Sequence, residues 1–143
     1  MPADAGVPEM GTMHKIEETK FGYRLTFEGF LRRDDGAAML EEMKTVVKPR
    51  SGGFALLIDM RNSRAFPTEA QEMLRQALLV CKENGLARSG IVLNSAIATL
   101  QAKRLAKETG IEASIRYIDA STHPEWEKVA GDWLIRAVEP ELG

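Results

Sequence analysis

Polar residues with functional potential cluster where the most apolar run of the chain ends. The run Phe54–Met60 contains one charged residue, Asp59, and polar side chains follow it. The candidates are Asp59, Arg61, Asn62, Ser63, Arg64 and Thr68. This stretch could be a reaction centre, a phosphorylation switch or an ordinary solvated loop. We predict a recognition loop, in which Arg61 and Arg64 offer hydrogen-bond donors to a carboxylate or phosphate.

Two further loops place polar residues after predicted strands. The second loop supplies Asn94 and Ser95, and the third supplies Asp119, Ser121, Thr122 and His123. Because open parallel sheets bind ligands outside the carboxyl ends of their strands, these loops could extend the same site. Helix capping alone would also explain Thr68, Ser95 and Thr122, so both interpretations stay open.

Asp59 has a position that is typical of a phosphoacceptor, at the end of a central strand. Two-component receiver domains use such a carboxylate, with an acidic pair after the first strand and a lysine after the last. This chain begins with a predicted hairpin, and its last predicted strand ends in Asp119 and Ala120. We therefore predict that Asp59 accepts hydrogen bonds from loop amides, or pairs with Arg61 or Arg64.

The residue types used in catalysis and metal binding are few and far apart. Cys81 falls on the apolar stripe of a predicted helix, where a thiol behaves as a small apolar group, and nothing brings His123 to it. The other histidine, His14, lies in a predicted strand, so no metal-ligating cluster is visible. Gly52 and Gly53 precede a strand, unlike a phosphate-binding loop, which precedes a helix. We predict no catalytic residue, no metal and no cofactor.

Hydrophobic periodicity predicts the elements that position these loops. Residues 14–31 form two alternating runs joined by a short Gly-containing link, as in an antiparallel hairpin. Continuous apolar runs predict buried parallel strands at Phe54–Met60, Ser89–Asn94 and Ser114–Ala120. Four helices with apolar stripes should cover this sheet; their expected N-terminal caps are Asp34 or Asp35, Thr68 with Gln71, Ser95, and Thr122 with Glu125. The fold class is α/β, with an N-terminal hairpin joined to a mostly parallel mixed sheet.

Composition narrows the class of protein. The chain has 143 residues, a formal net charge of -2 and one cysteine. This charge gives no basic face for nucleic acid, and a single cysteine excludes an internal disulfide framework. No apolar stretch approaches the ~20 residues that span a bilayer, and no signal peptide is evident, so we expect a cytoplasmic protein. We expect one domain over residues 13–138, with a disordered tail at 1–12 and a short tail at 139–143.

The element order, with "LLIDMRNSRAFP" and the closing "IRYIDASTHPEWEKVAGDWL", resembles the STAS superfamily, in particular its SpoIIAA-like branch of anti-sigma factor antagonists. The final helix carries the Ala-x-x-Trp-Leu pattern of that branch at Ala130, Trp133 and Leu134. These residues fall on the predicted core stripe and support the fold. The resemblance implies a small non-enzymatic regulatory module.

The same resemblance implies a phosphorylation switch that this sequence does not reproduce. In the anti-sigma factor antagonists a kinase phosphorylates a serine at the start of the second helix, within an Asp-Ser-Ser-Gly-type motif. Here the corresponding residues are Pro67, Thr68, Glu69 and Ala70. Thr68 alone could take the acceptor position, and it already serves as a predicted cap. We predict no working phospho-switch.

Two functions from different classes follow. The first is a regulatory module that binds a protein partner through the second helix and the loops at its start. The second is a carrier or sensor of a small apolar or anionic ligand, with Arg61 and Arg64 at the mouth of its site, by analogy with the similar architecture of lipid-binding Sec14 proteins. We also expect weak homodimerisation, because the hairpin offers a sheet edge and Leu79, Ile97 and Leu100 fall outside the main core stripes.

Overall fold

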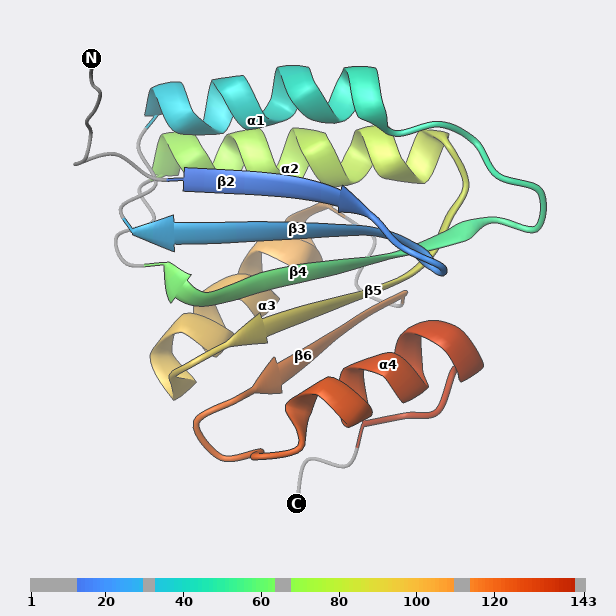
Figure 1. Ribbon diagram of the computed structural model, residues 1–143. Coiled ribbons are helices and arrows are strands. Elements are labelled where there is room, and N and C mark those ends of the chain that lie inside the picture. Colours follow the sequence, from blue (N-terminus) through green and yellow to red (C-terminus); the bar gives the residue numbers. More distant parts are fainter. Residues whose placement is uncertain (1–12, 30–32, 64–67, 110–113, 141–143) are drawn as a thin grey trace, which may run out of the picture.

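A five-stranded mixed sheet lies between helices on its two faces (Figure 1). The computed structural model describes residues 13–29, 33–63, 68–109 and 114–140, without the side chains at positions 13, 33, 68–71, 105, 106 and 109. The elements follow one another as β2 (Met13–Glu18), β3 (Gly22–Gly29), α1 (Arg33–Val46), β4 (Phe54–Ser63), α2 (Thr68–Glu83), β5 (Leu86–Leu93), α3 (Ala96–Thr109), β6 (Ile115–Asp119) and α4 (Trp126–Arg136).

The N-terminal hairpin is confirmed. Strand β2 pairs antiparallel with β3, from Met13 opposite Glu28 to Glu18 opposite Tyr23. The turn between them ends at Gly22, whose backbone N–H donates to the Thr19 hydroxyl at 3.0 Å. Gly22 has a φ of 154°, and a Cβ there would lie 2.0 Å from the Ala55 carbonyl oxygen. Only glycine allows β4 to approach the turn so closely.

The rest of the sheet is parallel, as predicted. The strand order is β2-β3-β4-β5-β6, and β3 pairs parallel with β4, β4 with β5, and β5 with β6. A parallel neighbour requires a crossover connection, and α1, α2 and α3 supply these three crossovers. The carboxyl ends of β4, β5 and β6 therefore meet at one edge, where the polar loops were expected.

Three helices cover one face of the sheet and one helix covers the other (Figure 1). The predicted stripes of α1 and α2 are buried against the first face, among them Met39, Met43, Leu78 and Cys81. On the second face α4 packs its buried side chains onto the strands. That cluster comprises Trp126, Ala130, Trp133 and Leu134 of α4, with Ala55, Leu57, Val92 and Ile118 beneath them.

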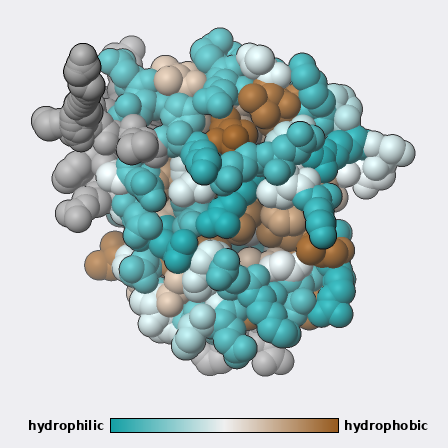
Figure 2. Space-filling model, viewed as in Figure 1, coloured by the Kyte–Doolittle hydropathy of each residue, from teal (hydrophilic) through white to brown (hydrophobic). Residues whose placement is uncertain are grey.

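Helix α4 covers only part of its face. It contacts β4, β5 and β6, while the hairpin strands lie beyond it. Figure 2 shows this side as largely hydrophilic, with hydrophobic residues visible in a hollow above α4. A pocket beside α4 has Phe21, Leu57 and Trp126 in its lining. None of the helices in the described ranges is long and apolar enough to cross a membrane.

Besides differences of one residue at strand ends and the start of β5, which lies at Leu86 and not at Ser89, three predicted element boundaries were wrong. Strand β4 does not end at Met60 but continues to Ser63, because β3 runs beside it and pairs Glu28 with Asn62 after an irregularity in the register. Helix α1 already begins at Arg33, which places Asp34 and Asp35 in its first turn, where negative charge favours the helix dipole.

The third wrong boundary is the start of α4. Glu125 occupies its N-cap without a side-chain hydrogen bond, so the expected capping box of Thr122 and Glu125 does not form. The Thr122 hydroxyl instead donates to the Asp119 carbonyl oxygen at 3.1 Å, inside the turn that precedes the helix.

Candidate functional site

The Asp59 carboxylate is buried and fully engaged, with its side chain only 4% exposed. Arg61 holds it with two guanidinium bonds, Nε to Oδ1 and NH2 to Oδ2, both at 2.9 Å. The backbone N–H of Arg61 also donates to Oδ1 at 3.1 Å, and Arg24 NH2 donates to Oδ2 at 2.8 Å. The prediction that Asp59 bonds a loop amide or pairs with an arginine is confirmed.

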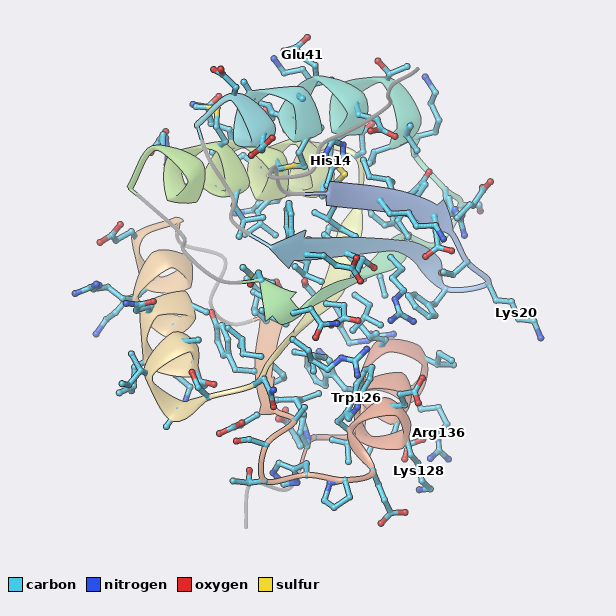
Figure 3. All side chains as sticks on the ribbon, turned by 60° about the vertical axis from the view of Figure 1, so that its left-hand side comes forward. His14, Lys20, Glu41, Trp126, Lys128 and Arg136 are labelled. Atoms are coloured by element: carbon cyan, nitrogen blue, oxygen red, sulfur yellow. The ribbon has the colours of Figure 1, made fainter. Side chains whose placement is uncertain are left out.

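Arg61 is fixed from a second side by Trp126. The guanidinium carbon lies 4.2 Å from the centroid of the indole ring, within the range of a cation–π contact. Trp126 is the first residue of α4 and lies between that helix and the sheet, whereas Lys128 and Arg136 point away from the sheet (Figure 3). The unit formed by Arg24, Asp59, Arg61 and Trp126, called here the Asp59 clamp, ties β3, β4 and α4 together.

The electrostatics of the clamp keep Asp59 charged. Burial on its own would raise the pKa of the Asp59 carboxyl, but the hydrogen bonds from Arg61 and Arg24 outweigh it and hold that pKa below its usual range. The same bond raises the pKa of the Arg61 guanidinium. A carboxylate has about four lone-pair sites, and four N–H donors occupy those of Asp59. This geometry suits a structural clamp rather than a base or nucleophile.

Sequence analysis did not identify Arg24 as part of the site. The alternating pattern of β3 places Arg24 on the polar face of the hairpin, opposite Tyr23, Leu25 and Phe27. Because β3 pairs parallel with β4, with Thr26 opposite Asp59, Arg24 can reach the carboxylate from the neighbouring strand. Knowledge of this register would have been needed to find the contact.

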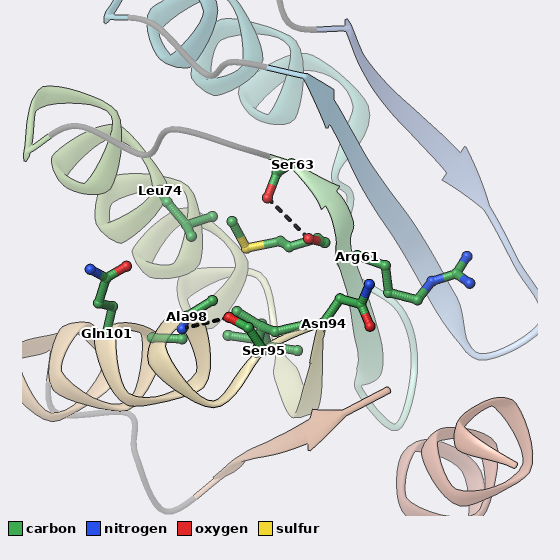
Figure 4. Close-up of a pocket in the computed structure, with 11 residues that line it drawn as sticks. Arg61, Ser63, Leu74, Asn94, Ser95, Ala98 and Gln101 are labelled. Atoms are coloured by element: carbon green, nitrogen blue, oxygen red, sulfur yellow. Dashed lines mark hydrogen bonds between the residues drawn. The ribbon is translucent and has the colours of Figure 1, made fainter. Parts of the chain in front are cut away.

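The opposite face of the same strand end is hollow. A pocket of about 300 Å³ lies between α2 and α3, over the carboxyl ends of β4 and β5 (Figure 4). We call it the α2–α3 pocket. Its described lining is Met60, Arg61, Ser63, Leu74, Ile91, Leu93, Asn94, Ser95, Ala98, Gln101 and Ala102.

Two hydroxyl groups in this pocket have local structural duties. The Ser63 hydroxyl donates to the Met60 carbonyl oxygen at 3.0 Å (Figure 4). Ser95 Oγ accepts a bond from the backbone N–H of Ala98, also at 3.0 Å, which confirms Ser95 as the cap of α3. Arg61 belongs to the lining, but Figure 4 shows its side chain leaving the pocket, toward the Asp59 clamp.

The residues of the third loop form hydrogen bonds with one another. Asp119 Oδ1 accepts bonds from both the backbone N–H and the hydroxyl of Ser121. The His123 carbonyl oxygen accepts from the Trp126 N–H at 3.1 Å, and the ring is half-buried. These bonds build the turn into α4. Since β6 pairs Asp119 with Leu93, this turn follows the sheet edge beside Asn94.

The structure thus divides the predicted site residues among several places. Ser63, Asn94 and Ser95 line one pocket, while Asp59 and the Arg61 guanidinium lie on the α4 side of β4. Asn62 is exposed at the end of β4. Arg64 and the Thr68 side chain lie outside the described residues, although α2 does begin at Thr68.

Other titratable residues have local roles. Cys81 is fully buried, as predicted, and this burial raises the pKa of its thiol to about 12. His14 Nε2 lies 2.7 Å from Glu42 Oε1, an exposed contact between β2 and α1. Within the described ranges no three His, Cys, Asp or Glu side chains converge on a point where they could hold a metal ion. Glu139, expected in a tail, is paired with Arg116 at 2.6 Å.

Comparison with known proteins identifies the fold. No protein-family model matches the sequence, and no curated protein matches it. Among solved structures, the chain is similar to an uncharacterised protein of the DUF3478 family with a SpoIIAA-like fold from Shewanella loihica PV-4. The match has a TM-score of 0.56 and 18% sequence identity, and it covers 90% of this chain and 98% of the other. The chain therefore has a SpoIIAA-like α/β fold.

Proposed function

We propose that this chain is a non-enzymatic regulatory module that binds a partner protein through the exposed side of α3. One observation carries the proposal. Ile97 and Leu100, in the first turns of α3, have 72% and 67% of their surface exposed. They are three residues apart and therefore lie on one side of the helix, next to the polar loop end at Asn94.

The other side of α3 explains why these residues face outward. Ala98 and Ala102 pack partly buried against the core, so α3 is already anchored without Ile97 and Leu100. Burying a large aliphatic side chain stabilises a complex by about 1.5–3 kcal/mol. An apolar centre bordered by the polar side chains of Asn94 and Ser95 has the composition of a protein–protein interface core with its rim.

The Asp59 clamp supports a non-enzymatic role, because the carboxylate that sequence alone would single out has its acceptor sites occupied by arginine donors. We further propose that no phospho-switch operates at Thr68, since the residues around it lack the serine pair and glycine of the related motif. The module would act in the cytoplasm, where a single buried cysteine stays reduced.

The test is affinity capture from a lysate of the source organism. The bait is the wild-type chain beside an Ile97→Ser, Leu100→Ser double variant. Ile135→Ser is the matched control, because Ile135 is 60% exposed on α4, which covers the opposite face of the sheet from α3. We expect the double variant to lose the captured partner and Ile135→Ser to keep it. Equal capture by all three baits would refute the α3 surface.

A further inference from the structure

The α2–α3 pocket has a position and a size that suit a small molecule. It lies where ligands bind in open parallel sheets, outside the carboxyl ends of adjacent strands. Its volume of about 300 Å³ is at the lower end of the range for ligand pockets, which is about 300–1,000 Å³.

Its walls are apolar. The sheet contributes Met60, Ile91 and Leu93, α2 contributes Leu74, and α3 contributes Ala98 and Ala102. The two alanines are decisive, because larger side chains at these positions of α3 would fill the space between α3 and α2. Small residues here keep the pocket open.

The pocket offers no positive charge from the described residues. Arg61 is the one charged residue of the described lining, and its guanidinium is bound to Asp59 and stacked on Trp126, on the other side of β4. An anion placed in the pocket would lose its hydration without a compensating cation from the described residues, which is costly. The expectation of an anionic ligand with Arg61 and Arg64 at the mouth is therefore revised for Arg61, while Arg64 lies outside the described residues.

Two amide side chains remain for recognition at the rim. Asn94 and Gln101 line the pocket, both are exposed, and neither side chain bonds to another described residue. Each amide has a donor and an acceptor, so it can pair with a hydroxyl or carbonyl group.

From these features we infer that the α2–α3 pocket binds a neutral, mainly apolar small molecule that carries one hydroxyl or carbonyl group, with its apolar body against Ala98 and Ala102 and its polar end at Asn94 and Gln101. This binding goes beyond the proposed function, because it uses the inner side of α3 and needs no partner protein. A module with both sites could couple the ligand to the partner through α3.

The test compares two probes of similar shape and different charge. The probes are 2-naphthol, which is neutral at pH 7, and 2-naphthoate, which is an anion, each titrated into the full-length chain and followed by amide chemical shifts in NMR. We expect 2-naphthol to bind at least tenfold more tightly, with the largest shifts at Ile91, Asn94 and Ala98. The inference is overturned by equal or tighter binding of 2-naphthoate, by shifts centred elsewhere, or by no binding of 2-naphthol at millimolar concentration.

Variants separate the pocket from the surrounding surface. Ala98→Leu should fill the pocket and weaken 2-naphthol binding at least tenfold, whereas Ala38→Leu, the same change on the exposed side of α1, should leave it unchanged. Retained binding in Ala98→Leu would contradict the assignment.

A rim variant keeps the test independent of core packing. Gln101→Lys adds a cation at an exposed position and should strengthen 2-naphthoate binding at least fivefold, with 2-naphthol changed less than twofold. No gain for the anion would overturn the charge argument. The Ile97→Ser, Leu100→Ser variant should still bind 2-naphthol, so loss of ligand binding can be told apart from loss of the partner.

Discussion

The two sides of the carboxyl end of β4 differ in charge: one side pairs charged groups, and the other forms a mainly apolar pocket. Toward α4, Asp59 and Arg61 bury their charges against each other, and Arg24 and Trp126 complete the packing. Toward α2 and α3, Met60 lines a pocket in which no charged group of the described residues is directed inward. Adjacent residues of a strand point to opposite faces, so one short stretch of sequence supplies both sides. Asp59 and Arg61 therefore support the fold, and the other side of β4 holds the pocket that we propose as a ligand site.

Several side-chain contacts besides the Asp59 clamp hold helix α4 against the sheet. Besides the Asp59 clamp, Arg116 stacks on Trp133 with its guanidinium carbon 4.3 Å from the ring centroid. The Trp133 indole N–H donates to the Ser89 carbonyl oxygen at 3.0 Å, and Arg88 donates to the Leu134 carbonyl oxygen at the end of the helix. Among the described residues, helix α3 has fewer such side-chain bonds to the sheet.

The largest effect should come from removing the carboxylate at the centre of the clamp. Asp59→Ala leaves the guanidinium groups of Arg24 and Arg61 without their anion and should lower the free energy of unfolding by about 3–5 kcal/mol. Urea denaturation measures this change. Asp132→Ala is the control, because Asp132 also pairs with two cations, Lys128 and Arg136, but on the solvent side of α4. Its urea midpoint should stay near that of the wild type, and an equal loss in both variants would show that burial of the clamp is unimportant.

The next largest effect should follow from truncating Arg61. Arg61→Ala removes the two guanidinium bonds to a buried carboxylate and the contact with Trp126, and it keeps the backbone N–H that also donates to Asp59. Since hydrogen bonds to charged groups contribute about 1.5–3 kcal/mol, a loss of about 2–3 kcal/mol is expected. Arg136→Ala, on the exposed side of α4, is the control. A wild-type denaturation curve for Arg61→Ala would contradict the clamp.

Acid should weaken the charged side selectively. The pKa of Asp59 is lowered in the folded state, so its contribution to stability is complete above the ordinary aspartate value of about 3.9 and is lost as the pH falls through the lower, folded-state pKa. The difference in unfolding free energy between the wild type and Asp59→Asn should therefore shrink below about pH 4. Urea titrations from pH 2.5 to 7 test this window, and a difference that stayed constant or grew toward low pH would argue against a charged Asp59.

The smallest effect concerns self-association of the chain through exposed residues of α3 and the edge strand β2. Ile97 and Leu100 are exposed as expected, whereas Leu79 is half-buried and contributes less surface. Together with the edge strand β2 these residues should give only a weak homodimer. Light scattering across a concentration series should show a rising mean mass, which Ile97→Ser with Leu100→Ser would reduce. A constant monomer mass at high concentration would remove this prediction.

The sequence was sufficient for most of the fold because the core is organised by local periodicity. The alternation in Tyr23, Leu25 and Phe27 predicted the hairpin, and the spacing of Trp126, Ala130 and Trp133 predicted the buried side of α4. Such patterns depend only on whether an element has one face in the core.

The site could be predicted only in part, because its geometry depends on neighbours distant in sequence. Arg24 and Asp59 are 35 positions apart and meet through the register of parallel strands. The extension of β4 to Ser63 likewise depends on β3 beside it. The α2–α3 pocket depends on how two helices pack, and the small side chains of Ala98 and Ala102 gave no polar signal that sequence analysis could follow.

The salt dependence of partner binding tests the central claim most directly, because it asks which side of β4 recognises the partner. The partner captured from lysate on the wild-type chain is washed with increasing NaCl up to 1 M, where the Debye length falls to about 3 Å and exposed charge pairs are screened. Recognition through Ile97 and Leu100 predicts that the partner is retained at 1 M NaCl. Release of the partner at moderate salt would contradict the account and return recognition to the arginines of the Asp59–Thr68 stretch.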